Sequence, residues 1–210
     1  MSRPLQAAAV APADLRRAAS RFATGVALVT APGGLALVID SFISVSLDPP
    51  LVAFAPSRTS LTWRNMRRTG RFGVSVLDAT HAAGIRERAR PGADRLAGLD
   101  MEPLDGVPVL GDALAALVCA VEAEHAAGDH SIVLGRVLAI RHGDARPPLV
   151  FFGGGFSTTG PATIGDPSAR AATASSTGAR SSEQLARGSV PLGDAKPTEI
   201  QRKRWTSVAS

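Results

Sequence analysis

The chain has 210 residues, of which 45% are hydrophobic and 20% are charged, which suits one globular core with an appendage. No apolar run reaches the roughly 18 residues that a membrane-spanning helix needs, and the first residues are too weakly apolar for a signal peptide. A cytoplasmic protein that does not contact membranes is therefore expected. The net charge of +5 lies mostly in residues 161–210, and the body lacks a basic stripe interleaved with aromatic residues, which argues against nucleic-acid binding.

The first part of the body alternates apolar runs with turn residues. Residues 12–23 place apolar side chains on one face at helical spacing, which predicts a short helix. Residues 26–31 and 35–39 are apolar strands around a Pro-Gly-Gly turn, a pattern typical of a hairpin.

The stretch from residue 41 to residue 54 combines hydroxyls with a rigid turn. Serines alternate with apolar side chains up to Leu47, Asp48-Pro49-Pro50 interrupts the strand because proline lacks an N–H donor, and residues 51–54 return as a buried strand. Hydroxyls and backbone N–H groups beside such a turn are able to hold a phosphate ester, whereas a hairpin with solvated serines is the simpler interpretation. These residues alone leave both interpretations open.

The later elements follow from caps and periodicity. Ser60 is a good N-cap and Gly70 a good C-terminal residue for a helix whose inner face would carry Trp63 and Met66. After Ser60 we expect a helix at 61–69, a half-buried strand at 71–77 and a polar helix at 78–89. A loop-rich stretch at 90–110 follows, then two long strands at 113–126 and 130–142 and a last short strand at 148–152. This order contains no βαβ repeat. It predicts a mainly β protein with short helices, in which hairpins and Greek-key connections close a small antiparallel barrel.

Composition changes near residue 157, where Ser, Thr, Ala, Gly and Pro begin to dominate. We therefore expect a folded domain over residues 12–156 and a low-complexity, disordered tail over residues 157–210, because the tail has too few large apolar residues to offset its ordering entropy. Cys119, the only cysteine, lies in an apolar run, which predicts a buried, inert thiol and excludes an intrachain disulfide. No ligand spacing indicates a metal site.

Five fragments, taken in order and spacing, carry a family resemblance. They are FATGV at 22–26, SFISVSLDPPL at 41–51, RFGVSVL at 71–77, GDHSIVLGRV at 128–137 and PLVFF at 148–152. Together they resemble the short-chain flavin reductases, the reductase components of two-component flavin monooxygenases, over about residues 12–157. The fragments at 41–51 and 128–137 are specific in combination.

The resemblance implies an FMN-binding split β-barrel, usually a homodimer. It implies an NAD(P)H:flavin oxidoreductase, in which NADH or NADPH reduces FMN or FAD and the reduced flavin passes to a partner flavin-dependent monooxygenase. The flavin carries the chemistry and the protein aligns the two rings, so no strong acid–base pair is required.

The resemblance also implies which residues form the site. The flavin would lie along the strand before the serine-rich stretch, with its phosphate near the following loop and helix. The cofactor-binding residues expected on this basis are Val38, Ile39, Asp40, Ser41, Ala55, Pro56, Ser57, Ser60, Leu61, Thr62, Arg88, Ala89, Gly153, Gly154, Gly155 and Phe156. His130 is the expected catalytic residue, beside the nicotinamide and flavin rings, and residues 153–156 would form a loop on the nicotinamide side.

Simpler roles compete at several of these positions. Ser60 serves as a helix cap in any case, Arg88 would be a surface arginine, and His130 a solvated turn residue. The chain also departs from the family, since Asp40 stands where an amide is usual and residues 153–156 lack the usual arginine and tyrosine. These departures motivate an alternative function, a non-catalytic split-barrel protein that binds flavin or another cofactor. An oxidase of the pyridoxamine-phosphate type on the same barrel has no supporting motif.

Overall fold

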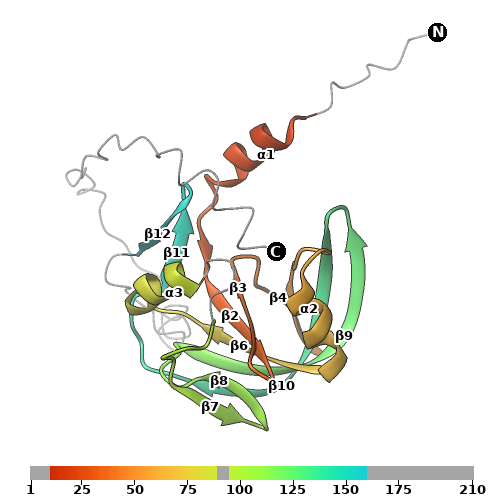
Figure 1. Cartoon of the computed structure of the whole chain (residues 1–210), viewed down its shortest axis with the longest axis vertical. Coiled ribbons are helices and arrows are strands. Elements are labelled where there is room, and N and C mark those ends of the chain that lie inside the picture. The colour runs from red at the N-terminus through yellow and green to blue at the C-terminus, as the bar shows by residue number, and fades with distance from the viewer. Residues whose placement is uncertain (1–9, 89–94, 160–210) are drawn as a thin grey trace, which may run out of the picture.

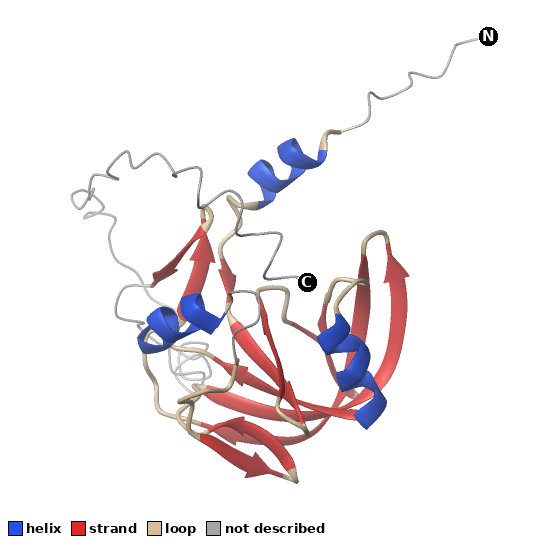
Figure 2. Cartoon of the chain, in the orientation of Figure 1, coloured by secondary structure: helices blue, strands red, loops and turns tan. Residues whose placement is uncertain are grey.

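The computed structural model describes residues 10–88 and 95–159, and it confirms the mainly β class predicted from the sequence (Figure 2). The helices are α1 (Pro12–Ala19), α2 (Leu61–Met66), η1 (Arg67–Thr69), η2 (Ala79–His81) and α3 (Ala82–Arg88), where η marks a 3-10 helix. The strands are β1 (Thr24–Gly25), β2 (Ala27–Ala31), β3 (Leu35–Ile39), β4 (Ile43–Leu47), β5 (Pro50–Phe54), β6 (Arg71–Val76), β7 (Met101–Leu104), β8 (Val107–Leu110), β9 (Ala115–Ala127), β10 (His130–His142), β11 (Leu149–Phe152) and β12 (Gly155–Thr158).

Seven of the strands form one antiparallel sheet in the order β3-β2-β6-β9-β10-β5-β4. The long strands β9 and β10 curve along this sheet (Figure 1). β3 and β4 are its two edges and do not pair with each other, so the barrel is split between them. A second sheet, β1-β11-β12, packs Leu149 and Phe151 against the face of β2 and β3 that carries Leu28 and Val38.

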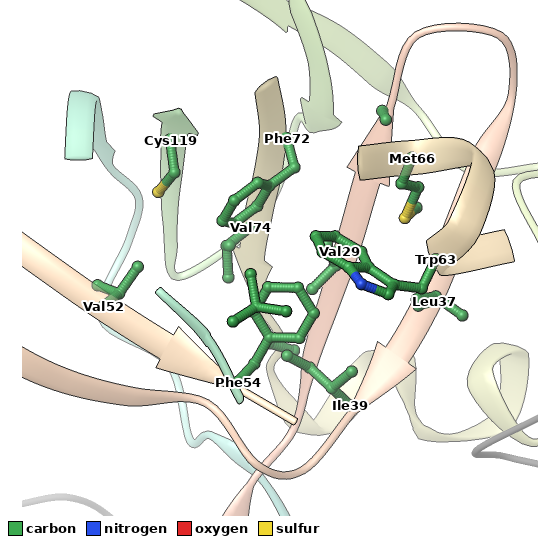
Figure 3. Close-up of a cluster of buried hydrophobic side chains, with 13 residues drawn as sticks. Val29, Leu37, Ile39, Val52, Phe54, Trp63, Met66, Phe72, Val74 and Cys119 are labelled. Carbon is green, nitrogen blue, oxygen red and sulfur yellow. The ribbon is translucent and has the colours of Figure 1, made fainter. Parts of the chain in front are cut away.

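Helix α2 packs between β3 and β5. Its Trp63 lies edge-on to Phe54 of β5 and Phe72 of β6, with ring centroids 5.1 and 6.3 Å away, and Leu37 and Ile39 of β3 join the same buried cluster (Figure 3). Edge-to-face aromatic pairs add about 0.5–1.5 kcal/mol beyond the burial of their area. The cluster therefore ties β3 to β5 through a helix rather than through strand pairing.

Several local predictions are confirmed. β4 and β5 form a hairpin with a cis Asp48–Pro49 peptide at its turn. Ser60 caps α2 by accepting a hydrogen bond from the Trp63 N–H at 3.2 Å, and Gly70 ends η1 with a φ of 71°. Cys119 is fully buried on β9, and burial raises the pKa of its thiol to about 12, so the thiol stays protonated and inert.

One predicted helix end and one predicted burial pattern are wrong because of tertiary contacts. α1 ends at Ala19 rather than at residue 23, since the chain turns at Ser20, whose carbonyl accepts a hydrogen bond from the Gly153 N–H at 2.9 Å. β6 is buried on both faces rather than one, because the hydroxyl of its Ser75 accepts a hydrogen bond from the Leu110 N–H of β8 at 2.9 Å.

The stretch expected to be loop-rich contains the β7–β8 hairpin. Asp105 and Gly106 form its turn with φ values of 47° and 78°, as an Asp-Gly hairpin turn requires. Pro103 and Pro108, which favour a loop in the sequence, are paired with each other across the two strands. A two-stranded ribbon tolerates these prolines because the outer edge of each strand pairs with no further strand and needs no N–H donor there.

The helical segment predicted after β6 is present as η2 and α3, and it begins with a buried polar network at Asp78. Asp78 accepts a hydrogen bond from the Thr80 N–H at 2.8 Å, and Arg146 Nε lies 2.8 Å from its second carboxylate oxygen. Burial raises the pKa of Asp78, but the hydrogen bonds from Thr80 and the charges of His81 and Arg146 outweigh burial and lower that pKa overall. Asp78 therefore stays ionised and links η2 to the segment that leads into β11.

The end of the folded domain lies slightly beyond the predicted one. β12 pairs with β11 as far as Thr158, past residue 156. Residues 160–210, which make up most of the expected tail, lie outside the described residues. In the described ranges, no helix has the length and apolarity that crossing a bilayer requires.

Replacing Gly135 by alanine is expected to destabilise the fold. A Cβ atom built on Gly135 lies 2.5 Å from Cζ of Phe72 and 3.1 Å from Cβ of Cys119, within the core. Overpacking of this kind costs about 1–3 kcal/mol of unfolding free energy, which chemical denaturation measures. The control is Gly25→Ala on β1, where a Cβ atom has nothing within 4 Å. Equal denaturation midpoints for the two variants would contradict this packing.

Candidate active site

A cavity of about 190 Å³ lies beside the edge strand β3. It is formed by the end of β3, the loop after β5 and the first residue of β10, and its lining residues are Leu37, Val38, Ile39, Asp40, Ser41, Ala55, Pro56, Ser57, Ser60 and His130. All of these except Leu37 belong to the site expected from the sequence. The fold thus brings three separate parts of the predicted site to one place.

Hydrogen bonds hold these three segments together. The Oγ atom of Ser41 accepts a hydrogen bond from the Ala55 N–H at 3.0 Å, which joins the chain after β3 to the loop after β5. Ser57 in that loop forms an isolated β-bridge with His130, which fixes the start of β10 against the loop. The hydroxyl of Ser41 keeps its own proton for a ligand, because an oxygen that accepts one hydrogen bond is still able to donate.

The wall of the cavity is the outer edge of β3. This strand pairs with β2 alone, so the N–H and C=O groups on its other edge belong to no ladder. Leu37 and Ile39 turn their side chains toward Trp63 (Figure 3). Val38 packs on the other side of the strand, in the same cluster as Leu28. The alternation leaves an apolar wall with a row of backbone polar groups, which suits a flat aromatic ligand with a polar rim.

His130 is held by its neighbour Asp129. Its Nδ1 atom lies 2.8 Å from a carboxylate oxygen of Asp129, and 37% of the His130 side chain is exposed. A carboxylate only accepts, so Nδ1 carries the hydrogen and Nε2 remains for a ligand. The hydrogen bond from His130, together with its charge, lowers the pKa of Asp129 and keeps that carboxylate ionised.

Asp40 places a second carboxyl group in the cavity. Burial raises the pKa of Asp40, and the opposing effects of its own backbone hydrogen bond and of the charge of His130 do not cancel this. Asp40 and His130 are the titratable members of the lining. The chemistry available here is therefore recognition by an apolar wall, hydroxyls and one histidine, rather than acid–base catalysis by a matched pair.

The cavity does not include every residue expected at the site. Leu61 is 68% exposed on α2 and, like Thr62, does not line the cavity. Both follow Ser60 in sequence, but α2 begins at Leu61, and neither residue of this first helical turn borders the cavity. Arg88 ends α3, and its side chain, like the whole of Ala89, lies outside the described residues.

Residues 153–156 form a tight hairpin rather than the predicted loop. Gly153 and Gly154 make the turn with φ values of 60° and 84°, and β12 begins at Gly155. The ring of Phe156 packs against Phe151 with centroids 5.8 Å apart, and the guanidinium of Arg86 lies 5.5 Å from the centroid of the Phe156 ring. These residues lie on the second sheet, and none of them lines the cavity.

Two residues of the site escape a sequence-based search. Leu37 looks like any inward-facing strand residue, because its side chain does pack in the core while its backbone borders the cavity. Asp129 precedes the histidine in a Gly-Asp-His turn, where an aspartate is common for conformational reasons alone. Only its hydrogen bond to His130 assigns it a role at the site.

Known proteins resemble this chain over most of the described fold. The chain matches the model of the flavin reductase like domain over residues 19–160. It is 40% identical over 147 residues to the FMN reductase (NADH) SmoA of Agrobacterium fabrum, which covers 68% of this chain and 83% of SmoA. It is 35% identical over 158 residues to HsaB of Rhodococcus jostii, the reductase subunit of a flavin-dependent monooxygenase, which covers 72% of this chain and 80% of HsaB.

A solved structure shows the same architecture. The NADH:FAD oxidoreductase SgcE6 of Streptomyces globisporus, in complex with NAD and FAD fragments, matches with a TM-score of 0.68 and 34% identity over 75% of this chain and 99% of its own. These similarities confirm the predicted split β-barrel, the predicted enzyme class, and flavin and nicotinamide as the cofactors of that class. The chain belongs to the flavin reductase-like family.

Proposed function

We propose that this protein is an NAD(P)H:flavin oxidoreductase that transfers a hydride from NADH or NADPH to FMN or FAD and supplies the reduced flavin to a partner monooxygenase. The observation that carries the proposal is the cavity beside β3, because it unites the SFISVS segment, the loop after β5 and the Gly-Asp-His turn. Relatives named as NADH-dependent reductases and as a monooxygenase subunit support the nucleotide and the partner.

The cavity fits the ring of a flavin better than a whole nucleotide. Its volume of about 190 Å³ is below the roughly 300–1,000 Å³ of sites that enclose a drug-sized ligand. An isoalloxazine ring is flat and apolar with a polar rim, and the edge of β3 offers an apolar wall with backbone donors and acceptors. We place the ring against Val38–Ser41 by this match, and the ribityl chain and phosphate along Ser57 and Ser60 at the rim.

The residues of the chain would then bind and orient the two rings. When bound, the flavin supplies the hydride acceptor and the nicotinamide the donor. β3 holds one face of the site rigidly, because Leu37 and Ile39 are anchored in the aromatic cluster. His130 offers Nε2 to the nicotinamide side, in a tautomer that Asp129 fixes. Such alignment of reactants is worth several orders of magnitude in rate without any residue transferring a proton.

The proposal extends to the remaining residues expected at the site. Leu61 and Thr62 would border the flavin phosphate beyond Ser60, and Arg88 and Ala89 would approach it from α3. Residues 153–156 would contact the nicotinamide nucleotide, beside the exposed guanidinium of Arg86. We also propose that residues 12–156, with the last strand completed by Thr158, form the catalytic domain, and that it works in the cytoplasm, where NAD(P)H is available.

One feature favours the non-catalytic alternative. Asp40 introduces a carboxyl group into a cavity otherwise lined by apolar side chains, hydroxyls and one histidine, and a carboxylate near a ligand phosphate weakens binding. A protein that binds flavin without turnover would tolerate this, as would a reductase that exchanges flavin rapidly.

Steady-state nucleotide oxidation distinguishes the two functions. We expect purified protein to oxidise NADH or NADPH only when FMN or FAD is added, since flavin is a substrate that the enzyme releases. The assay combines each nucleotide with each flavin and with no flavin. Flavin binding by fluorescence quenching without oxidation of either nucleotide would refute the reductase function and favour the binding protein.

His130→Ala is expected to lower kcat about tenfold at saturating flavin, the loss expected for one aligning hydrogen bond, with the flavin KM within about twofold. In the proposed binding mode His130 orients the nicotinamide, and its replacement leaves intact the edge of β3 against which the flavin ring would lie. The control is His125→Ala, which removes an exposed histidine from β9 of the same hairpin. A raised flavin KM with unchanged kcat would place His130 on the flavin instead.

We further propose that the protein is a homodimer. α1 has no buried residue although it is amphipathic, with Leu15 63% exposed. Exposed apolar side chains also gather on the edge strand β4, on β10 and after α1, namely Ile43, Val45, Leu47, Ile132, Leu138, Ile140 and Phe22. Unpaired strand edges and apolar surface of this extent are usually covered by a partner.

Sedimentation is expected to give a dimer at micromolar concentration rather than the 21.6 kDa of one chain. Ile43→Lys on β4 is expected to weaken the dimer at least tenfold, because it buries a charge in the apolar contact. Leu61→Lys, which places the same charge at an exposed residue of α2, is the control. A monomeric wild type would refute the dimer, and an equal effect of both substitutions would exclude β4 as its interface.

A further inference from the structure

Asp40 is an acidic group without a cationic partner of its own in the cavity. It follows the last residue of β3, and it is half-buried among apolar and hydroxyl side chains. The lining contains no lysine or arginine, and His130 is its one basic side chain. His130 is already hydrogen-bonded to Asp129, so it does not neutralise Asp40 by direct pairing.

The charge of a flavin ring changes during the proposed reaction. The oxidised isoalloxazine is neutral. Transfer of a hydride breaks a C–H bond of the nicotinamide and forms an N–H bond at N5 of the flavin. It gives NAD(P)⁺ and an anionic reduced ring, without uptake of a proton. A carboxylate at the wall of a partly desolvated cavity therefore has little effect on the substrate ring and repels the product ring.

We propose that Asp40 makes the cavity hold oxidised flavin more tightly than reduced flavin, and thereby promotes release of the reduced product. This inference rests on the proposed function, in which the ring lies against Val38–Ser41. It makes Asp40 a residue that selects the redox state of the ligand rather than a catalytic residue. A reductase that hands its product to a separate monooxygenase needs this selection, because tightly held reduced flavin would not be delivered.

The effect depends on the ionisation of Asp40. Burial raises the pKa of Asp40, so the discrimination is present above that raised pKa and declines as the pH falls through it. His130 is the other titratable group of the lining. The carboxyl group of Asp40 sets the direction of the pH dependence, toward less discrimination in acid.

The test compares dissociation constants of oxidised and anaerobically reduced riboflavin and FMN for the wild type and for Asp40→Asn. We expect wild type to bind reduced riboflavin at least about tenfold more weakly than oxidised riboflavin, as for like charges at short range in a medium of intermediate dielectric. Asp40→Asn should remove most of this ratio and leave the affinity for oxidised riboflavin within about twofold. Asp40→Glu should retain the ratio.

A matched control is Asp105→Asn, which removes one acidic charge at the exposed β7–β8 turn, where asparagine tolerates the positive φ. It should leave the ratio unchanged. Equal tightening of oxidised and reduced riboflavin by Asp40→Asn would overturn the inference, and so would an effect confined to FMN, which would place the carboxylate near the phosphate. Failure of the wild type to bind any oxidised flavin would refute the proposed function itself.

Discussion

Trp63 packs between β3 and β5, beside the gap between the unpaired edges β3 and β4 of the main sheet. Its indole lies 5.1 Å from the ring of Phe54 and 6.3 Å from that of Phe72, so α2 is fixed to strands on both sides of the gap. Strand pairing across this gap would use the backbone groups on the outer edge of β3. Because the aromatic cluster joins β3 to β5 by side-chain packing instead, those backbone groups remain available along the cavity.

The same constraint explains how distant segments form one site. The edge of β3 is rigid because Leu37 and Ile39 are anchored below it. The hydrogen bond from the Ala55 N–H to Ser41 then joins the loop after β5 to the end of β3, and the bridge between Ser57 and His130 joins it to the start of β10. A rigid strand, one loop and one hairpin turn are enough to fix a flat ligand, and the rest of the fold serves to hold these three in register.

Local signals in the sequence predicted the parts of this arrangement that depend on local chemistry. The Ser60 cap, the proline turn after Leu47 and the hairpin strands follow from side-chain and backbone preferences within a few residues. The β7–β8 hairpin was missed because two prolines oppose a strand locally, although the Asp-Gly turn favours one. The burial of Asp78 was also missed, because its partner Arg146 is far away in sequence.

For the site, family motifs located the residues but not their arrangement. Residues 38–41, 55–57 and 130 do meet, whereas Leu61 and Thr62, adjacent to Ser60 in sequence, turn away with the helix. Sequence adjacency could not reveal this, because it depends on where α2 begins relative to β3. The bridge between Ser57 and His130 likewise joins residues that are far apart in the chain, so sequence adjacency does not reveal it.

The charges around the cavity agree with brief occupancy rather than permanent retention. No lysine or arginine belongs to the lining, so in the proposed binding mode a phosphate at its rim would take hydroxyl and backbone contacts from the lining, and a cation only from outside it, as proposed for Arg88. In the proposed binding mode, most of the affinity would then come from the apolar wall and from the backbone edge of β3, which would contact the ring. A site that binds mainly through the ring, with an acidic group beside it, is suited to a ligand that must enter, react and leave in each cycle.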